Sequence, residues 1–385
     1  MRIFIILKNL IISLLGVRVF NEKQKKLYRI DCFVFAAMII SGVFISTFIM
    51  IGGGIRGVVI YNIFAFAMAG AASFAQAFIA KCFGILASYR IGIAAYVLTA
   101  LTVVILGERI NDFLWLSGTL SGISFTFFFV SRNTMILSYA DYNQDVESVY
   151  LGSMGTTNSI FAFVFPVLAG IFITSMTGIN LSMTGYYVIF SAGILLYLTG
   201  FIMTFFIPKP TPKNTNSKLW ADVRILLRKK AVIFSGFGEL FRGMLDVIAG
   251  FIFAMLVFEV TRTEAWVGTF GMVMAVCQFI GFFVFTRYTN LKRAKNFLLI
   301  FALTAAITPW LFLTGVQLWT LFMVGGAAFL AQSFQNSANV ICSNAIDGYV
   351  EGGFLIREIF IITGRMIGLT ILFFLSQMLK MPLLR

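Results

Sequence analysis

Long apolar stretches alternate along the chain with short polar connections. Eleven of these stretches are long enough to cross a bilayer as helices, for which roughly 20 apolar residues are needed. They cover residues 31–52, 57–80, 91–107, 113–138, 152–176, 185–207, 232–259, 266–286, 296–314, 317–341 and 354–379. The pattern predicts an all-α polytopic membrane protein with about eleven transmembrane helices.

One connection is longer than the others. Residues 208–230 hold three of the six prolines, followed by a short amphipathic helix from Ser217 to Lys230. The first 30 residues also combine a helical apolar period with basic residues, which is typical of an interfacial helix. These features predict a cytoplasmic interfacial segment (1–30), an N-terminal six-helix bundle (31–207), a cytoplasmic linker (208–230) and a C-terminal bundle of about five helices (231–385).

Composition and charge agree with a membrane location. The chain is 60% hydrophobic and 11% charged, whereas a soluble domain is about a quarter charged. With the N-terminus in the cytoplasm, 22 Lys and Arg residues, Arg357 among them, fall on the cytoplasmic side and 5 on the outer side. This asymmetry follows the positive-inside rule. The net charge of +14 therefore indicates basic cytoplasmic loops of a plasma- or inner-membrane protein, not a nucleic-acid-binding surface.

Several classes of chemistry lack the residues they need. The chain has no histidine, and its four cysteines form no CxxC motif, so we expect neither a metal site nor disulfides. No phosphate-binding loop is present. We therefore expect no cofactor and no enzymatic activity.

The two halves of the chain share a short motif. Val146-Glu147 precedes the fifth span and Val350-Glu351 precedes the eleventh, at an offset of 204 residues, each in a predicted acidic loop. Together with the linker and the two basic amphipathic segments, this repeat favours a duplicated six-helix unit, as in many secondary transporters.

Two segments carry a resemblance to a known family. Ala77-Phe78-Ile79-Ala80-Lys81-Cys82-Phe83-Gly84-Ile85 lies where the major facilitator superfamily has the signature G-x-L-A-D-R-x-G-R, of which an Ala and the later Gly remain. Pro166-Val167-Leu168-Ala169-Gly170 is similar to the P-x-x-G-G end of a motif of drug–proton antiporters. In layout, the chain resembles this superfamily over nearly its whole length. The resemblance implies two pseudo-symmetric bundles, with spans one, four, seven and ten lining a central cavity, and a twelfth span that this sequence lacks.

Charged side chains inside the spans are the main candidate site residues, because charge within a bilayer is unfavourable and marks substrate, ion or proton paths. Glu239, Arg242 and Asp246 share one helical face at i, i+3 and i+7. Arg365 lies about 16 Å into the last span by rise per residue. We expect it to pair with Asp246, with Glu358 and Glu239 as the next candidates. The alternative is a structural ion cluster at the cytoplasmic end of the seventh span.

An amide face extends this candidate site. Gln332, Gln335, Asn336 and Asn339 follow one another at helical spacing in the tenth span and are predicted to line an aqueous cavity. The alternative for these amides is hydrogen bonding between helices. The five charges Glu239, Arg242, Asp246, Glu358 and Arg365 sum to −1, so one surplus carboxylate could carry a proton.

The first half offers secondary candidates, which are Asp31, Asn62, Arg132 and Asn158. We interpret Asp31 as an acid at the start of the first helix, with a structural role. Arg132 either lines the cytoplasmic mouth or neutralises the acids of the following loop, Asp141, Asp145 and Glu147.

These residues favour a secondary active transporter that works by alternating access around a central polar cavity. Proton coupling is the expected energy source, and the aromatic composition favours export of an amphiphilic or hydrophobic small molecule. The expected partners are the lipid bilayer, the substrate and protons. The alternatives are a lipid or lipid-linked carrier, and a non-transporting membrane scaffold that has kept the fold.

Overall fold

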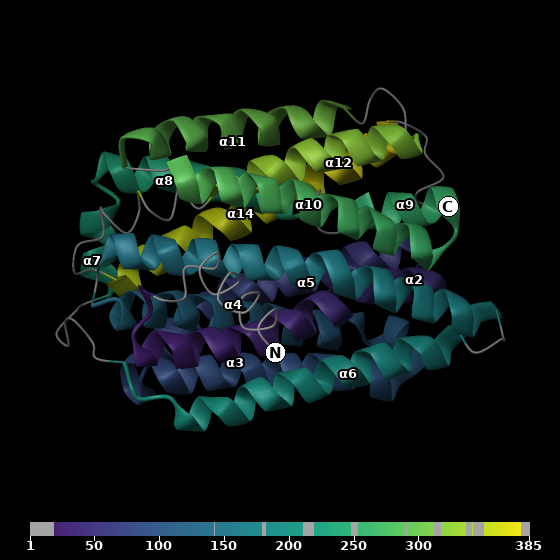
Figure 1. Cartoon of the computed structure of the whole chain (residues 1–385), viewed down its shortest axis with the longest axis horizontal. Coiled ribbons are helices and arrows are strands. Elements are labelled where there is room, and N and C mark those ends of the chain that lie inside the picture. The colour runs from purple at the N-terminus through teal and green to yellow at the C-terminus, as the bar shows by residue number, and fades with distance from the viewer. Residues whose placement is uncertain are drawn as a thin grey trace, which may run out of the picture.

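The computed structural model describes residues 19–141, 143–178, 182–210, 219–247, 253–288, 291–311, 317–335, 341 and 350–378. Figure 1 shows two groups of helices, one above the other. The first group contains α2 (Glu22–Phe83), α3 (Ile85–Leu106), α4 (Leu114–Tyr139), α5 (Gln144–Gly178) and α6 (Ser182–Met203), with the short 3₁₀ helix η2 (Gly107–Phe113) between α3 and α4.

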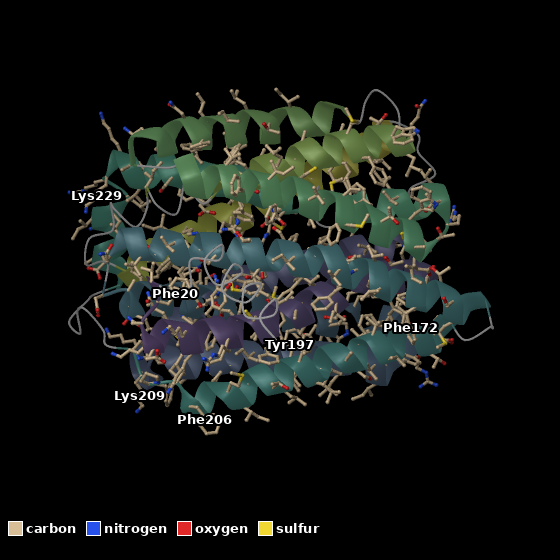
Figure 2. All side chains as sticks on the ribbon, in the orientation of Figure 1. Phe20, Phe172, Tyr197, Phe206, Lys209 and Lys229 are labelled. Atoms are coloured by element: carbon tan, nitrogen blue, oxygen red, sulfur yellow. The ribbon has the colours of Figure 1, made fainter. Side chains whose placement is uncertain are left out.

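The second group follows α7 (Leu219–Leu226), which lies at one end of the molecule (Figure 1). It contains α8 (Lys230–Val247), α9 (Phe253–Thr261), α10 (Glu264–Tyr288), α11 (Leu291–Leu311), α12 (Leu318–Gln332), the one-turn η6 (Ser333–Gln335) and α14 (Val350–Met378). Lys209 and Lys229 lie at the same end as α7, and Phe172 lies toward the opposite end (Figure 2).

The described residues confirm a multi-pass, all-α membrane protein. Within the described ranges, six helical segments are long and apolar enough to span a membrane, namely Glu22–Gly54, Arg56–Phe83, Ile85–Tyr139, Val149–Met176, Met183–Phe206 and Glu264–Val284. The segment Ile85–Tyr139 has 55 residues because it joins α3, η2 and α4. The described part of the chain contains no strand.

The first two predicted spans are the two arms of α2, separated by a break at Gly54. Gly54 has φ 58° and ψ −165°, a conformation that glycine adopts without a Cβ clash. At its other end, α2 begins with a capping box, in which the Asn21 side chain accepts from the Gln24 backbone N–H and the Gln24 side chain accepts from the Asn21 N–H. The helix thus begins well before Asp31, and the prediction of Asp31 as a helix-start acid is wrong.

Several helices begin earlier than the predicted spans. α3 begins at Ile85, not 91, and α5 begins at Gln144, not 152. Hydropathy marks where a chain enters hydrocarbon, whereas helical hydrogen bonding continues into the flanking polar residues. For the same reason the two Val-Glu pairs lie in the first turns of α5 and α14 and not in loops. Acids in a first turn interact favourably with the helix dipole.

The two groups meet where α5 packs along α10, and where α14 packs against α2 and α4. Small residues permit the first of these contacts. A Cβ on Gly170 would lie 2.7 Å from the Glu264 carbonyl oxygen, and one on Gly268 would lie 2.6 Å from the Pro166 carbonyl oxygen. The antiporter-like segment of α5 thus forms part of the boundary between the two groups.

Candidate functional site

Two glycines bring α8 and α14 into backbone contact. A Cβ on Gly243 would lie 2.9 Å from the Arg365 backbone nitrogen, and one on Gly364 would lie 3.0 Å from Leu240 Cα. At this separation, side chains on the facing surfaces reach across from one helix to the other. The charged residues of both helices lie on either side of this crossing.

Asp246 is the centre of the predicted cluster. Arg365 donates from Nη2 to Asp246 Oδ2 at 2.9 Å, which confirms the predicted pairing. Gln332 donates from Nε2 to Asp246 Oδ1 at 3.1 Å, and Arg242 Nε lies 3.9 Å from Asp246 Oδ2. A single carboxylate thus connects α8, α12 and α14.

A second ion pair lies nearer the α7 end of the same two helices. Arg357 donates from Nε to Glu239 Oε1 at 2.7 Å, and Arg242 approaches Glu239 Oε2 from Nη1 at 3.3 Å. Arg357, which the charge count placed on the cytoplasmic side, belongs to α14, and its side chain is only 6% exposed. Buried arginine needs a carboxylate partner, and Glu239 provides it.

With Arg357 included, the charge of the cluster differs from the predicted value. Glu239, Asp246 and Glu358 face three arginines, so the cluster is formally neutral and the predicted surplus carboxylate is wrong. Glu358 is nevertheless distinct, because it is buried and its Oε2 has no hydrogen-bond partner among the described residues. It is the member of the cluster whose carboxylate has an oxygen available for a proton or a ligand.

Arg365 also contacts the first group of helices. Its guanidinium carbon lies 4.2 Å from the ring centroid of Phe125 on α4 and 5.3 Å from that of Phe66 on α2. Both distances are within the range of cation–π attraction. Arg365 therefore pairs with a carboxylate of its own half and stacks on aromatic rings of the other half.

Only part of the predicted amide face can be placed. The Gln332 side chain turns toward Asp246, and its Oε1 has no partner in the described structure. The side chain of Gln335, and Asn336 and Asn339 entirely, lie outside the described residues. For these three residues the lining of an aqueous cavity stays a prediction.

The first half contains a separate buried network around Asp31. Arg132 on α4 donates from Nε to Asp31 Oδ2 at 2.6 Å. Tyr89 on α3 donates to Asp31 Oδ1 and Tyr150 on α5 to Oδ2, each at 2.9 Å. Asp31 is fully buried. One carboxylate thus connects all of the helices α2, α3, α4 and α5.

This network overturns both interpretations of Arg132. Its guanidinium is directed at Asp31 and not at the cytoplasmic mouth or the acids that follow α4. The other two secondary candidates are Asn62 and Asn158. Asn62 donates to the Val58 carbonyl of its own helix at 2.8 Å, while Oδ1 of both Asn62 and Asn158 lacks a partner in the described structure.

Five residues of these networks are absent from the predicted site, namely Arg357, Tyr89, Tyr150, Phe66 and Phe125. Arg357 directly precedes Glu358 in sequence. It also lies seven residues, about two helical turns, before Gly364, so it shares the face of α14 that crosses α8. The two tyrosines and the two phenylalanines have no comparable signal, because aromatic residues are abundant throughout the spans. Among the described residues, no cluster of three or more His, Cys, Asp or Glu could hold a metal ion.

Comparison with solved structures defines the class of fold. The E. coli fucose:proton symporter FucP superposes with a TM-score of 0.68 over 93% of this chain and 92% of that chain, at 14% identity. The human organic anion transporter MFSD10 (TETRAN) gives 0.62 over 90% and 92%, at 11% identity. A bacterial homologue of the iron transporter ferroportin gives 0.56 over 92% and 98%, at 11% identity. The fold is that of the major facilitator superfamily, as the sequence resemblance predicted.

Sequence comparison adds one relative. The uncharacterized protein YqgE of Bacillus subtilis (strain 168) is 26% identical over 238 residues, which are 61% of this chain and 53% of that protein. The chain thus matches about half the length of this relative. No family model matches the chain.

Proposed function

We propose that this protein is a secondary active transporter that works by alternating access, coupled to protons. The observation that supports this most directly is the position of Arg365, which is held by Asp246 of its own half and lies on Phe125 and Phe66 of the other half. A charged contact between two rocking bundles can respond both to their relative position and to the protonation of nearby carboxylates.

In the proposed cycle, the Asp246–Arg365 pair stays in the second half while the rings of the first half move past it. Glu358 is the proposed proton acceptor, because it lies on the same helix as Arg365 and one of its carboxylate oxygens has no hydrogen-bond partner among the residues that the structure describes. Protonation of Glu358 removes a negative charge from the arginine cluster and so changes how tightly Arg365 is held. The amide oxygen of Gln332, which has no partner in the described part of the chain, is the proposed polar contact for substrate.

The substrate in this proposal is an amphiphilic or hydrophobic small molecule, and the direction is export across the plasma or inner membrane. Phe66 and Phe125 beside Arg365 would offer an apolar surface next to a fixed charge. The solved relatives carry quite different substrates, namely fucose with a proton for FucP and organic anions for MFSD10. Because proteins of this fold carry chemically different substrates, the substrate has to be identified by direct measurement.

Reconstituted protein tests the proposal. Proteoliposomes with an imposed pH gradient would be assayed with a panel of amphiphiles, sugars, organic anions and phospholipids. We expect gradient-driven transport of an amphiphile in the wild type. Glu358→Gln should lose gradient-driven accumulation while keeping substrate exchange between the two sides, because exchange needs no net proton movement.

Glu108→Gln is the matched control, since Glu108 is an exposed acid outside the cluster and should transport normally. Gradient-driven accumulation by Glu358→Gln at the wild-type level would refute the role of Glu358. Movement of phospholipid alone would favour a lipid carrier. Absence of transport for every compound, with the fold intact, would favour a scaffold.

A further inference from the structure

A groove follows the seam between α10 and α12, away from the charged cluster. It has a volume of about 570 Å³ and is lined by residues that include Trp266, Val273 and Cys277 of α10 and Trp319, Met323 and Leu330 of α12. Its lining contains no charged residue. Trp319 is 79% exposed and Met323 is 76% exposed, so the groove opens on the outer surface of the helix bundle.

The two helices of the groove run in the same direction. The Trp266 ring lies 6.5 Å from the Phe322 ring near the start of both helices. Further along, a Cβ on Gly326 would lie 3.2 Å from Cys277 Sγ, and one on Gly281 would lie 2.6 Å from the Leu330 carbonyl oxygen. Trp266 and Trp319 therefore lie at one mouth of the groove, at the end of the molecule opposite α7 (Figure 1).

The length of the groove corresponds to one leaflet of a bilayer. Trp266 to Cys277 and Trp319 to Leu330 each advance about 16 Å at the rise of an α-helix. One leaflet contributes about 15 Å of hydrocarbon, half of the roughly 30 Å core. Tryptophan is enriched at the boundary between hydrocarbon and head groups, which is where these dimensions place Trp266 and Trp319.

The occupant follows from the surroundings. α10 is long and apolar enough to cross the membrane, so in a bilayer the open side of the groove would face lipid. Water has too few polar partners in such a lining to be held there. An empty groove would forfeit the dispersion contacts of its walls. We propose that the groove binds one acyl chain of a phospholipid, drawn from the leaflet at which α10 and α12 begin, with its head group beside the two tryptophans.

The charge distribution predicts that this is the outer leaflet, because Lys209, α7 and Lys229 lie at the other end. The inner end of the groove also approaches the candidate site. Leu330 lies two residues before Gln332, whose amide holds Asp246. A bound chain would therefore support α12 against α10 directly beside the residue that contacts the ion-pair network.

Native mass spectrometry of the full-length chain, purified in detergent from membranes, tests this proposal. The wild type should retain one phospholipid per chain. Ala327→Phe places a ring in the groove and should lower the retained phospholipid about tenfold, corresponding to about 1.4 kcal/mol of lost contact. The control is Ala71→Phe, the same change at an exposed site on α2 in the other half, which should retain phospholipid as the wild type does.

Gel filtration and thermal melting establish that both variants fold, and Ala327→Leu replaces Ala327→Phe if the larger side chain prevents folding. Equal phospholipid retention by wild type and the blocked variant would overturn the proposal. A wild type that carries no phospholipid would overturn it as well. A two-chain complex that the blocking substitution dissociates would show that a second copy covers the groove instead. None of these outcomes depends on whether the protein transports a substrate.

Discussion

Arg365 has two kinds of partner, and each makes a different demand on its side chain. Asp246 requires a positive charge, whereas the rings of Phe125 and Phe66 favour a flat, weakly hydrated cation. A guanidinium meets both demands, and the ammonium of lysine meets the first better than the second. Because Arg365 is only 5% exposed, its charge has little contact with water. The carboxylate and the two rings therefore stabilise the charged side chain.

The buried pair predicts a non-additive effect of substitution. Arg365→Gln or Asp246→Asn alone strands a charge, which costs roughly 3–5 kcal/mol. The double substitution Asp246→Asn with Arg365→Gln removes both charges and should recover much of that loss. Thermal melting in detergent measures the three variants, with exposed Arg56→Ala as the control. Additive losses in the double variant would contradict the pairing.

Asp31 predicts a ranking of effects in the first half. Arg132→Ala leaves the Asp31 carboxylate without its cation and should destabilise the protein most. Tyr89→Phe and Tyr150→Phe each remove one hydrogen bond to that carboxylate, worth about 1.5–3 kcal/mol. Melting temperatures should therefore fall further for the arginine variant than for either tyrosine variant. A tyrosine variant less stable than Arg132→Ala would indicate that Arg132 is not the principal partner.

At the scale of the helices, close crossings decide which side chains can meet. α8 and α14 place Glu239 with Arg357 and Asp246 with Arg365 because Gly243 and Gly364 remove the side chains between the two backbones. The two pairs follow the same register along the parallel helices, at sequence separations of 118 and 119 residues. The glycines thus determine the geometry of the ion pairs without contributing a polar group.

This crossing predicts opposite signs for one substitution at two sites. Gly243→Ala should destabilise the protein, because its Cβ would lie within 3.0 Å of the α14 backbone. Gly42→Ala, in α2, should stabilise it by about 0.5–1 kcal/mol, since alanine is the better helix former. A Cβ on Gly42 meets nothing within 4 Å. Equal melting temperatures for both variants would show that α8 and α14 separate at little cost.

The sequence predicted the helices better than their contacts. Apolar length gave the spans, and helical spacing gave the face shared by Glu239, Arg242 and Asp246, because both depend on local periodicity. The pairing of Arg365 with Asp246 was predictable from depth alone, since few acids lie at that level. Arg357 and the tyrosines around Asp31 were not, because their roles depend on which helices adjoin, and apolar sequences carry little information on helix order.

For the whole molecule, the uneven distribution of Lys and Arg predicts the orientation. The N-terminus, the linker at 208–230 and the connection at 287–295 should face the cytoplasm, and with an odd number of spans Arg385 should face outward. In a chain whose four native cysteines are replaced by serine, Asn214→Cys should react with an impermeant thiol reagent only in inverted vesicles, and Arg385→Cys only in right-side-out cells. Labelling of both positions from the same side would refute the count of eleven spans.

The glycine crossing of α8 and α14 also has a consequence for evolution. Each glycine faces the backbone of the other helix, since a Cβ on Gly243 would meet the Ile361 carbonyl oxygen and one on Gly364 would meet the Leu240 carbonyl oxygen, so a larger residue at either position forces the helices apart. Across related sequences that keep this crossing, both positions should therefore remain small. A subfamily in which both have become large must have separated these helices, and we expect it also to have lost the acid–arginine pairs that depend on their contact.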